Sequence, residues 1–177
     1  MIRWLRRKLL FLALLAVGAA VLFHKREDAT PPIVAPLSGP IDRIIIEKIS
    51  RRMVVYRGDT PLREYPIALG FTPTGAKQRQ GDGKTPEGVF RINRVNAQSS
   101  YHLSLGLDYP QTADAARAVT GGYDAGGDIF IHGQPNGLPD GTVLKTDWTA
   151  GCIAVSNAAI DEIFAAASIG TVVEIHP

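Results

Sequence analysis

Branched and aromatic residues gather along the chain in short segments, which polar turns separate. Three of these segments follow one another closely at residues 42–50, 52–59 and 62–71, and "RGDT" forms a turn between the last two. Runs of Ile, Val and Tyr with this spacing are typical of β-strands, and three neighbouring strands form a β-meander. The chain has four further segments of this kind, at 89–95, 101–110, 128–133 and 171–177.

Two segments have helical patterns instead. Residues 156–168, "SNAAIDEIFAAAS", predict the clearest helix, with Ser156 or Asn157 as its N-cap. Residues 112–119 predict a short helix that Thr112 caps. Glycine and proline are frequent in the segments between these elements, which predicts loops there. The pattern therefore indicates a mainly β chain with short α-helices, in the α+β class.

The first 40 residues differ from the rest. A basic start, "MIRWLRRK", precedes an uncharged apolar run at 9–23, and "HKRED" ends that run. This order is typical of an export signal, and basic residues before the run place the rest of the chain outside the cytoplasm. We expect residues 1–23 to be a signal anchor or a signal peptide. The anchor, in the inner membrane, is favoured because cleavage after "VGA" would leave an apolar end.

A linker and one domain are expected after this leader. Residues 24–40 contain four prolines and little periodicity, which predicts an extended linker. The domain is then expected over 41–177, in a periplasmic or other extracytoplasmic location.

Charge is distributed unevenly between the leader and the domain. The whole chain has a formal net charge of +2, but residues 1–26 hold six Lys and Arg and no acidic residue. The remainder, 27–177, holds 13 basic against 17 acidic residues, a net charge of −4. A mildly acidic domain lacks the basic surface that nucleic-acid binding requires, so nucleic acid is not expected as a partner.

Metal and phosphate sites are poorly supported by the sequence. The four histidines are widely spaced, and no HExxH or CxxC motif is present, so no metal is expected. Gly83-Lys84-Thr85 matches the end of a P-loop, but Gln78 stands where that motif needs its first glycine and Pro86 follows at once.

The single cysteine, Cys152, is the strongest candidate for chemistry. An exported chain with one cysteine cannot form an internal disulfide, so its thiol is a candidate reactive group. A histidine within reach can take the thiol proton and return it to a leaving group. His132 ends a strand-like segment and precedes Gly133, so it can serve this purpose. The small residues Ala150 and Gly151 leave backbone N–H groups free to bind an oxyanion. Spacing alone leaves a buried cysteine and a core histidine as an open alternative.

The sequence also resembles a known family. "IHG" followed by "TAGCIAV", with "GDGKTPEGVFRI" some distance upstream, is similar to the L,D-transpeptidase catalytic domain, or YkuD, family. The resemblance covers Ile41 to Pro177. It implies a compact β-rich domain of packed mixed sheets, with no cofactor.

The resemblance also implies a reaction. The family's cysteine attacks a peptidoglycan stem peptide at the carbonyl of its third residue, releases a terminal D-amino acid and forms an acyl-enzyme that an amine then resolves. The matching residues here are Cys152 as nucleophile, His132 as base and the Gly133 carbonyl as the group that orients the base. The N–H groups of Ala150, Gly151 and Cys152 match the oxyanion donors.

Four aromatic or imidazole side chains are further candidates for lining the substrate site. The resemblance places "YHLSLGLDYP" near the substrate cleft, Trp148 lies four residues before Cys152, and one tyrosine lies in a glycine-rich loop before the His132 strand. These candidates are Tyr101, His102, Tyr123 and Trp148.

Two departures from the family pattern leave the acyl acceptor open. Ala150 stands where many members have histidine, and Ala154 stands where many have arginine or asparagine. "GCIAVSN" is similar to a branch that includes an amidase, which releases lipoprotein from the stem peptide. A transpeptidase, a hydrolase of the same fold and a non-catalytic wall-binding module therefore all stay open, and the partners expected are stem peptides and, for the amidase, a lipoprotein.

Overall fold

The computed structural model describes residues 37–177, which belong to one compact unit. The expected leader at 1–23 lies outside the described residues, as does most of the expected linker at 24–40. Within the described range, no helix has the length and apolar character needed to cross a membrane.

The domain begins with the predicted β-meander. Strands β1 (Arg43–Glu47), β2 (Arg52–Arg57) and β3 (Thr60–Pro66) pair antiparallel in sequence order. The remaining strands are β4 (Gly88–Ser99), β5 (His102–Leu107), β6 (Phe130–His132), β7 (Ile153–Ala154) and β8 (Val172–His176). Strand β4 is longer than the predicted segment 89–95, and the two residues of β7 were not predicted as a strand.

The strands form one mixed sheet with the order β3-β2-β1-β8-β4-β5-β6-β7. The pairs β1/β8 and β6/β7 are parallel and the others are antiparallel. The register of β4 against β5 shifts at two places, and such bulges bend a strand. Beyond β3 the chain continues across to β7, where Ala68 pairs with Ala154. This pairing brings the two ends of the sheet together around a common core.

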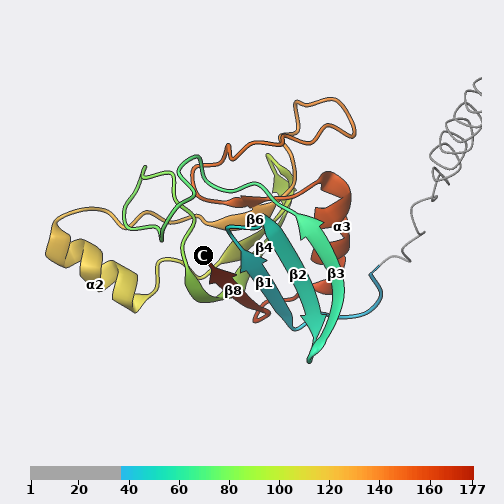
Figure 1. The fold of residues 1–177 in the computed structure, drawn as a ribbon, viewed down its shortest axis with the longest axis horizontal. Coiled ribbons are helices and arrows are strands. Elements are labelled where there is room, and N and C mark those ends of the chain that lie inside the picture. The colour runs from blue at the N-terminus through green and yellow to red at the C-terminus, as the bar shows by residue number, and fades with distance from the viewer. Residues whose placement is uncertain (1–36) are drawn as a thin grey trace, which may run out of the picture. The chain divides into compact units, whose positions relative to one another are not determined.

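Two helices accompany the sheet in the described residues, α2 (Thr112–Gly121) and α3 (Asn157–Ala166). Figure 1 shows α2 at one end of the domain and α3 beside the sheet, where it packs on β5 and β6. Ser156 caps α3 by accepting the N–H of Ala159, as predicted. The N-cap of α2 is Gln111, and not Thr112. The Asp114 carboxylate in the first turn accepts a hydrogen bond from the Gln111 N–H.

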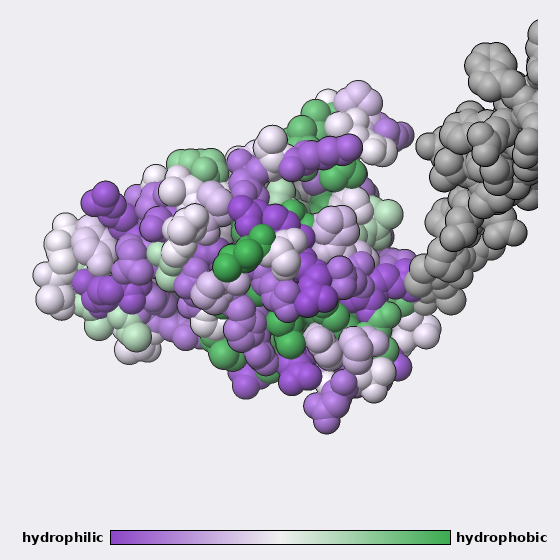
Figure 2. All heavy atoms as spheres, viewed as in Figure 1, coloured by the Kyte–Doolittle hydropathy of each residue, from purple (hydrophilic) through white to green (hydrophobic). Residues whose placement is uncertain are grey.

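The core consists of branched aliphatic side chains from both halves of the sheet and from the inner face of α3. Ile44, Ile131, Ile153, Ile160 and Val173 are all fully buried. By contrast, the face drawn in Figure 2 is largely hydrophilic, with small separate apolar patches. The predicted class, a mainly β fold with mixed strands and short helices, is confirmed.

Candidate active site

His132 occupies the last position of β6, between β5 and β7. Its side chain is 3% exposed, and its Nδ1 lies 2.7 Å from the carbonyl oxygen of Gly133. A carbonyl only accepts hydrogen bonds, so Nδ1 must carry the proton. The other ring nitrogen, Nε2, is then unprotonated and can act as a base.

Cys152 lies directly before β7, on the same face of the sheet as His132. The register pairs His132 with Ala154, and side chains two residues apart on a strand share a face. Strand spacing and rise place the Cα atoms of His132 and Cys152 about 8 Å apart, within reach of both side chains. The two side chains make no direct hydrogen bond, because the Cys152 Sγ–H donates to the Asp128 carbonyl at 3.4 Å.

Burial favours the uncharged form of both groups. Burial lowers the pKa of the His132 imidazole, although its hydrogen bond to Gly133 works in the opposite direction. Burial also raises the pKa of the Cys152 thiol, which the Phe130 N–H partly offsets. Both shifts favour a thiol and an imidazole over a thiolate–imidazolium ion pair.

The backbone N–H groups of residues 150–152 differ in whether they already donate a hydrogen bond. Gly151 donates its N–H to the Thr149 hydroxyl at 3.1 Å, so this group is already used. Ala150 and Cys152 donate to no group among the described residues, which leaves two of the three predicted oxyanion donors free. Gly151 has φ of +143°, and a Cβ there would lie 2.7 Å from the Lys84 carbonyl oxygen. The turn before Cys152 therefore requires glycine.

Thr149 holds the cysteine turn against the rest of the sheet. Its hydroxyl donates to the Cys152 carbonyl at 2.7 Å while accepting the Gly151 N–H. Its own N–H donates to Leu69 at 3.1 Å, and its carbonyl accepts the N–H of Phe71 at 2.9 Å. Sequence reasoning missed this role, since a threonine in a loop carries no signal of its partners.

Asp147 provides a second anchor for the same turn. Its carboxylate accepts two hydrogen bonds from the Arg51 Nε, at 3.0 and 3.1 Å, and one from the Arg51 Nη2 at 2.7 Å. It also accepts the Leu69 N–H at 2.9 Å. Arg51 lies in the β1–β2 turn, 96 residues from Asp147, so no local pattern could have predicted the pair.

Two of the predicted lining residues lie directly against His132. The Tyr101 ring stacks on the imidazole with centroids 4.6 Å apart and an angle of 34°. Trp148 meets the same imidazole edge-on at 5.6 Å and contacts Tyr101 at 5.8 Å. The three rings form one cluster, and the buried Trp148 Nε1 has no hydrogen-bond partner among the described atoms. These aromatic side chains shield the His132 imidazole from water.

The other two predicted lining residues face elsewhere. His102 lies close to Gly133 through its Cβ, but its ring hydrogen-bonds Asp161 on α3 at 2.7 Å. Tyr123 follows α2, and its ring lies over Gly121 of that helix. It makes no ring contact or hydrogen bond with the other candidate site residues. Within residues 37–177, no group of three or more His, Cys, Asp or Glu is placed to hold a metal ion.

A thiol and an imidazole on one face of a mixed β-sheet, with free N–H donors beside the thiol, have the chemical groups that acyl transfer through cysteine requires. The family comparison agrees with this chemistry. The model of the L,D-transpeptidase catalytic domain, YkuD, matches residues 41–175, and the chain therefore belongs to this family.

Individual relatives support the assignment over part of their length. The chain is 34% identical over 105 residues to the "Putative L,D-transpeptidase YafK" of Escherichia coli K12, a match that covers 58% of this chain and 36% of that protein. Among solved structures, the helical cell shape determining protein Pgp2 of Campylobacter jejuni superposes with a TM-score of 0.59 at 25% identity, over 80% of this chain and 50% of that one. An L,D-transpeptidase of Xylanimonas cellulosilytica shares the fold, with a TM-score of 0.53 at 17% identity over 80% of this chain and 63% of that one. The chain thus spans about a third of the curated relative and half of Pgp2.

Proposed function

We propose that this chain is a cysteine L,D-transpeptidase that acts on peptidoglycan stem peptides outside the cytoplasm. The observation that carries the proposal is the position of Cys152 beside a buried His132 whose Nδ1–H is committed to Gly133. That hydrogen bond fixes the ring and leaves Nε2 as the only nitrogen able to take a proton. Family membership supports peptidoglycan stem peptides as the substrate class.

The reaction begins at the thiol. The Cys152 Sγ–H turns from the Asp128 carbonyl toward His132, and Nε2 takes the proton as Sγ attacks the carbonyl carbon of the third stem residue. The negative charge that develops on the carbonyl oxygen is stabilised by the free N–H groups of Ala150 and Cys152. The tetrahedral intermediate then collapses to a thioester, and the departing D-amino acid takes the proton from His132.

The second half of the reaction reverses these roles. An amine attacks the thioester, gives up a proton to Nε2 and displaces Cys152, which takes the proton back. Tyr101 and Trp148 pack on the imidazole and limit its contact with water, which favours its neutral form. Water as the acceptor would instead give hydrolysis. With a lipoprotein-linked stem as the donor, the lipoprotein amine would leave as the thioester forms, and water would then release the stem peptide from Cys152.

Mass spectrometry of the full chain with muropeptides tests the proposal. A tetrapeptide stem serves as the donor, a free D-amino acid serves as the acceptor, and a lipoprotein-linked stem is tested in parallel. We expect an exchanged product and an acyl adduct on the wild-type chain, and neither on Cys152→Ala. His132→Ala should lose the product, while His176→Ala, which changes an exposed histidine, should keep it.

Three other results would contradict transpeptidation through Cys152. Release of the lipoprotein without exchange would identify an amidase, and product formation that persists in Cys152→Ala would remove the thiol from the mechanism. Absence of any product or adduct from every donor would leave a wall-binding module.

A further inference from the structure

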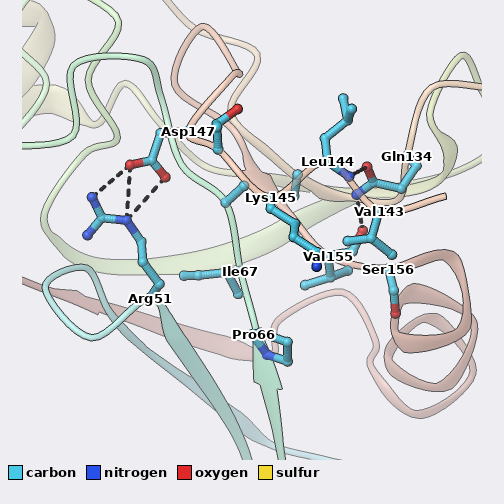
Figure 3. A pocket seen from close by; sticks show the side chains of 13 residues that line it. Arg51, Pro66, Ile67, Gln134, Val143, Leu144, Lys145, Asp147, Val155 and Ser156 are labelled. Carbon is cyan, nitrogen blue, oxygen red and sulfur yellow. Dashed lines mark hydrogen bonds and ion pairs between the residues drawn. The ribbon is translucent and has the colours of Figure 1, made fainter.

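A pocket of about 660 Å³ lies next to the candidate active site. It borders strand β7, whose Ala154 is the register partner of His132. Three segments form most of its wall: residues 66–68 beyond β3, 143–147 of the long loop and 154–156 at the end of β7. Figure 3 shows these segments facing one another across the pocket. Its size lies within the range of small-molecule sites.

The pocket touches the catalytic elements at three points. Ala154 is the register partner of His132, Gln134 follows Gly133, and Asp147 precedes Trp148. The pocket is therefore adjacent to the candidate site, yet neither Cys152 nor His132 contributes to its wall.

The wall is mainly apolar. The apolar lining residues are Pro66, Ile67, Ala68, Val143, Leu144, Ala154 and Val155. A hydrocarbon ligand would therefore find continuous apolar contact in this pocket.

Most polar side chains in the wall already have partners. The Gln134 amide donates to the Val155 carbonyl at 2.6 Å and accepts the Leu144 N–H at 2.9 Å. Asp147 is bonded to Arg51, and the Ser156 hydroxyl caps α3. These hydrogen bonds fix the orientation of the three side chains in the wall.

Lys145 differs from them. Its ammonium makes no hydrogen bond or ion pair with any described residue, and Figure 3 shows the side chain directed into the pocket, toward Val155. Lys145 is an exposed residue, and its ammonium beside the apolar part of the wall complements a ligand with one anionic group.

We propose that this pocket binds a medium-chain carboxylate, with the hydrocarbon chain along the apolar wall and the carboxylate on Lys145. The site is separate from the proposed transpeptidase chemistry and does not require Cys152.

Equilibrium dialysis of the full chain against radiolabelled straight-chain carboxylates tests the proposal directly. Burying one methylene is worth about 0.8 kcal/mol, so each added CH₂ should tighten binding about fourfold from hexanoate to decanoate. Decanol and decylamine should bind at least about tenfold more weakly than decanoate, because they lack the charge that pairs with Lys145. The Cys152→Ala variant should bind decanoate normally, which separates this site from the transfer reaction.

Matched variants locate the site. Val143→Glu puts a negative charge at the pocket wall and should abolish binding, whereas Val119→Glu changes an exposed valine on α2 and should not. Lys145→Ala should weaken binding about tenfold, and Lys145→Arg should restore most of it. This comparison also excludes binding by the apolar segment 9–23, which all four variants share.

Tryptophan fluorescence gives an independent reading of position. The chain has two tryptophans, so Trp4→Phe leaves Trp148, next to Asp147 of the pocket wall, as the sole reporter. Decanoate should shift its emission with the same affinity that dialysis gives.

Three results would overturn the proposal: no saturable binding of decanoate, equal binding of decanol, or binding that Val143→Glu leaves unchanged. Tighter binding of an apolar peptide such as N-acetyl-leucyl-leucine would also overturn it, since the ligand class would then be wrong.

Discussion

Asp147→Asn tests whether the Arg51–Asp147 pair holds the cysteine turn in place. Asparagine has nearly the same shape and can still accept the Leu69 N–H. It lacks the negative charge of the carboxylate, with which Arg51 makes three contacts. The Asp147 side chain is 19% exposed, and that of Arg51 is 36% exposed, so water screens the pair only partly. Hydrogen bonds to charged groups contribute about 1.5–3 kcal/mol, and we expect a loss of unfolding free energy in this range.

Urea denaturation measures this loss as a fall in the midpoint at constant m-value. Glu64→Gln is the matched control, because it breaks an ion pair with Arg52 whose side chains are 40% and 59% exposed. Such exposed pairs contribute about 0–1 kcal/mol. A loss for Asp147→Asn no larger than that for Glu64→Gln would refute the anchoring role. The Arg51→Gln/Asp147→Asn double-mutant cycle should show a coupling energy of about 1 kcal/mol or more.

The remaining predictions concern the turn, the base and the thiol. Gly151→Ala forces a Cβ against a backbone carbonyl at positive φ and should reduce acyl-enzyme formation at least about tenfold, whereas Gly137→Ala, which meets open space, should not change the mass-spectrometric yield. Because burial lowers the pKa of His132, the unfolded chain binds more protons just below pH 6.5, so stability should fall as pH falls from there; His132→Ala should remove this dependence in urea titrations at several pH values. Because burial raises the pKa of Cys152, the unfolded thiol ionises first, and stability should fall above pH 9 in wild type but not in Cys152→Ala. Tyr101→Leu should expose the imidazole and raise the pKa of His132, as an NMR titration would report, while Tyr101→Phe should leave it unchanged.

The sequence was sufficient for the elements that a local pattern specifies. The meander, the final strand and α3 all follow from runs of branched residues and from a Ser156 cap, and the structure has them close to the expected positions. Strand β7 could not be predicted in this way, because two residues carry no periodicity. It becomes a strand only because β6 and the segment around Ala68 supply hydrogen-bond partners on both sides.

The same distinction applies within the candidate site. Cys152 and His132 could be selected because their chemistry is carried by residue type and because "IHG" and "TAGC" match a family. Tyr123 was selected on its position in a glycine-rich loop, and the structure turns its ring onto Gly121 instead. What fixes the cysteine turn is a set of contacts between distant parts of the chain, above all the pair of Asp147 with Arg51. A residue's role in such a contact depends on which other segment lies beside it, so this role can be recognised only in the folded structure. For this reason, the groups that position the thiol are harder to predict than the thiol itself.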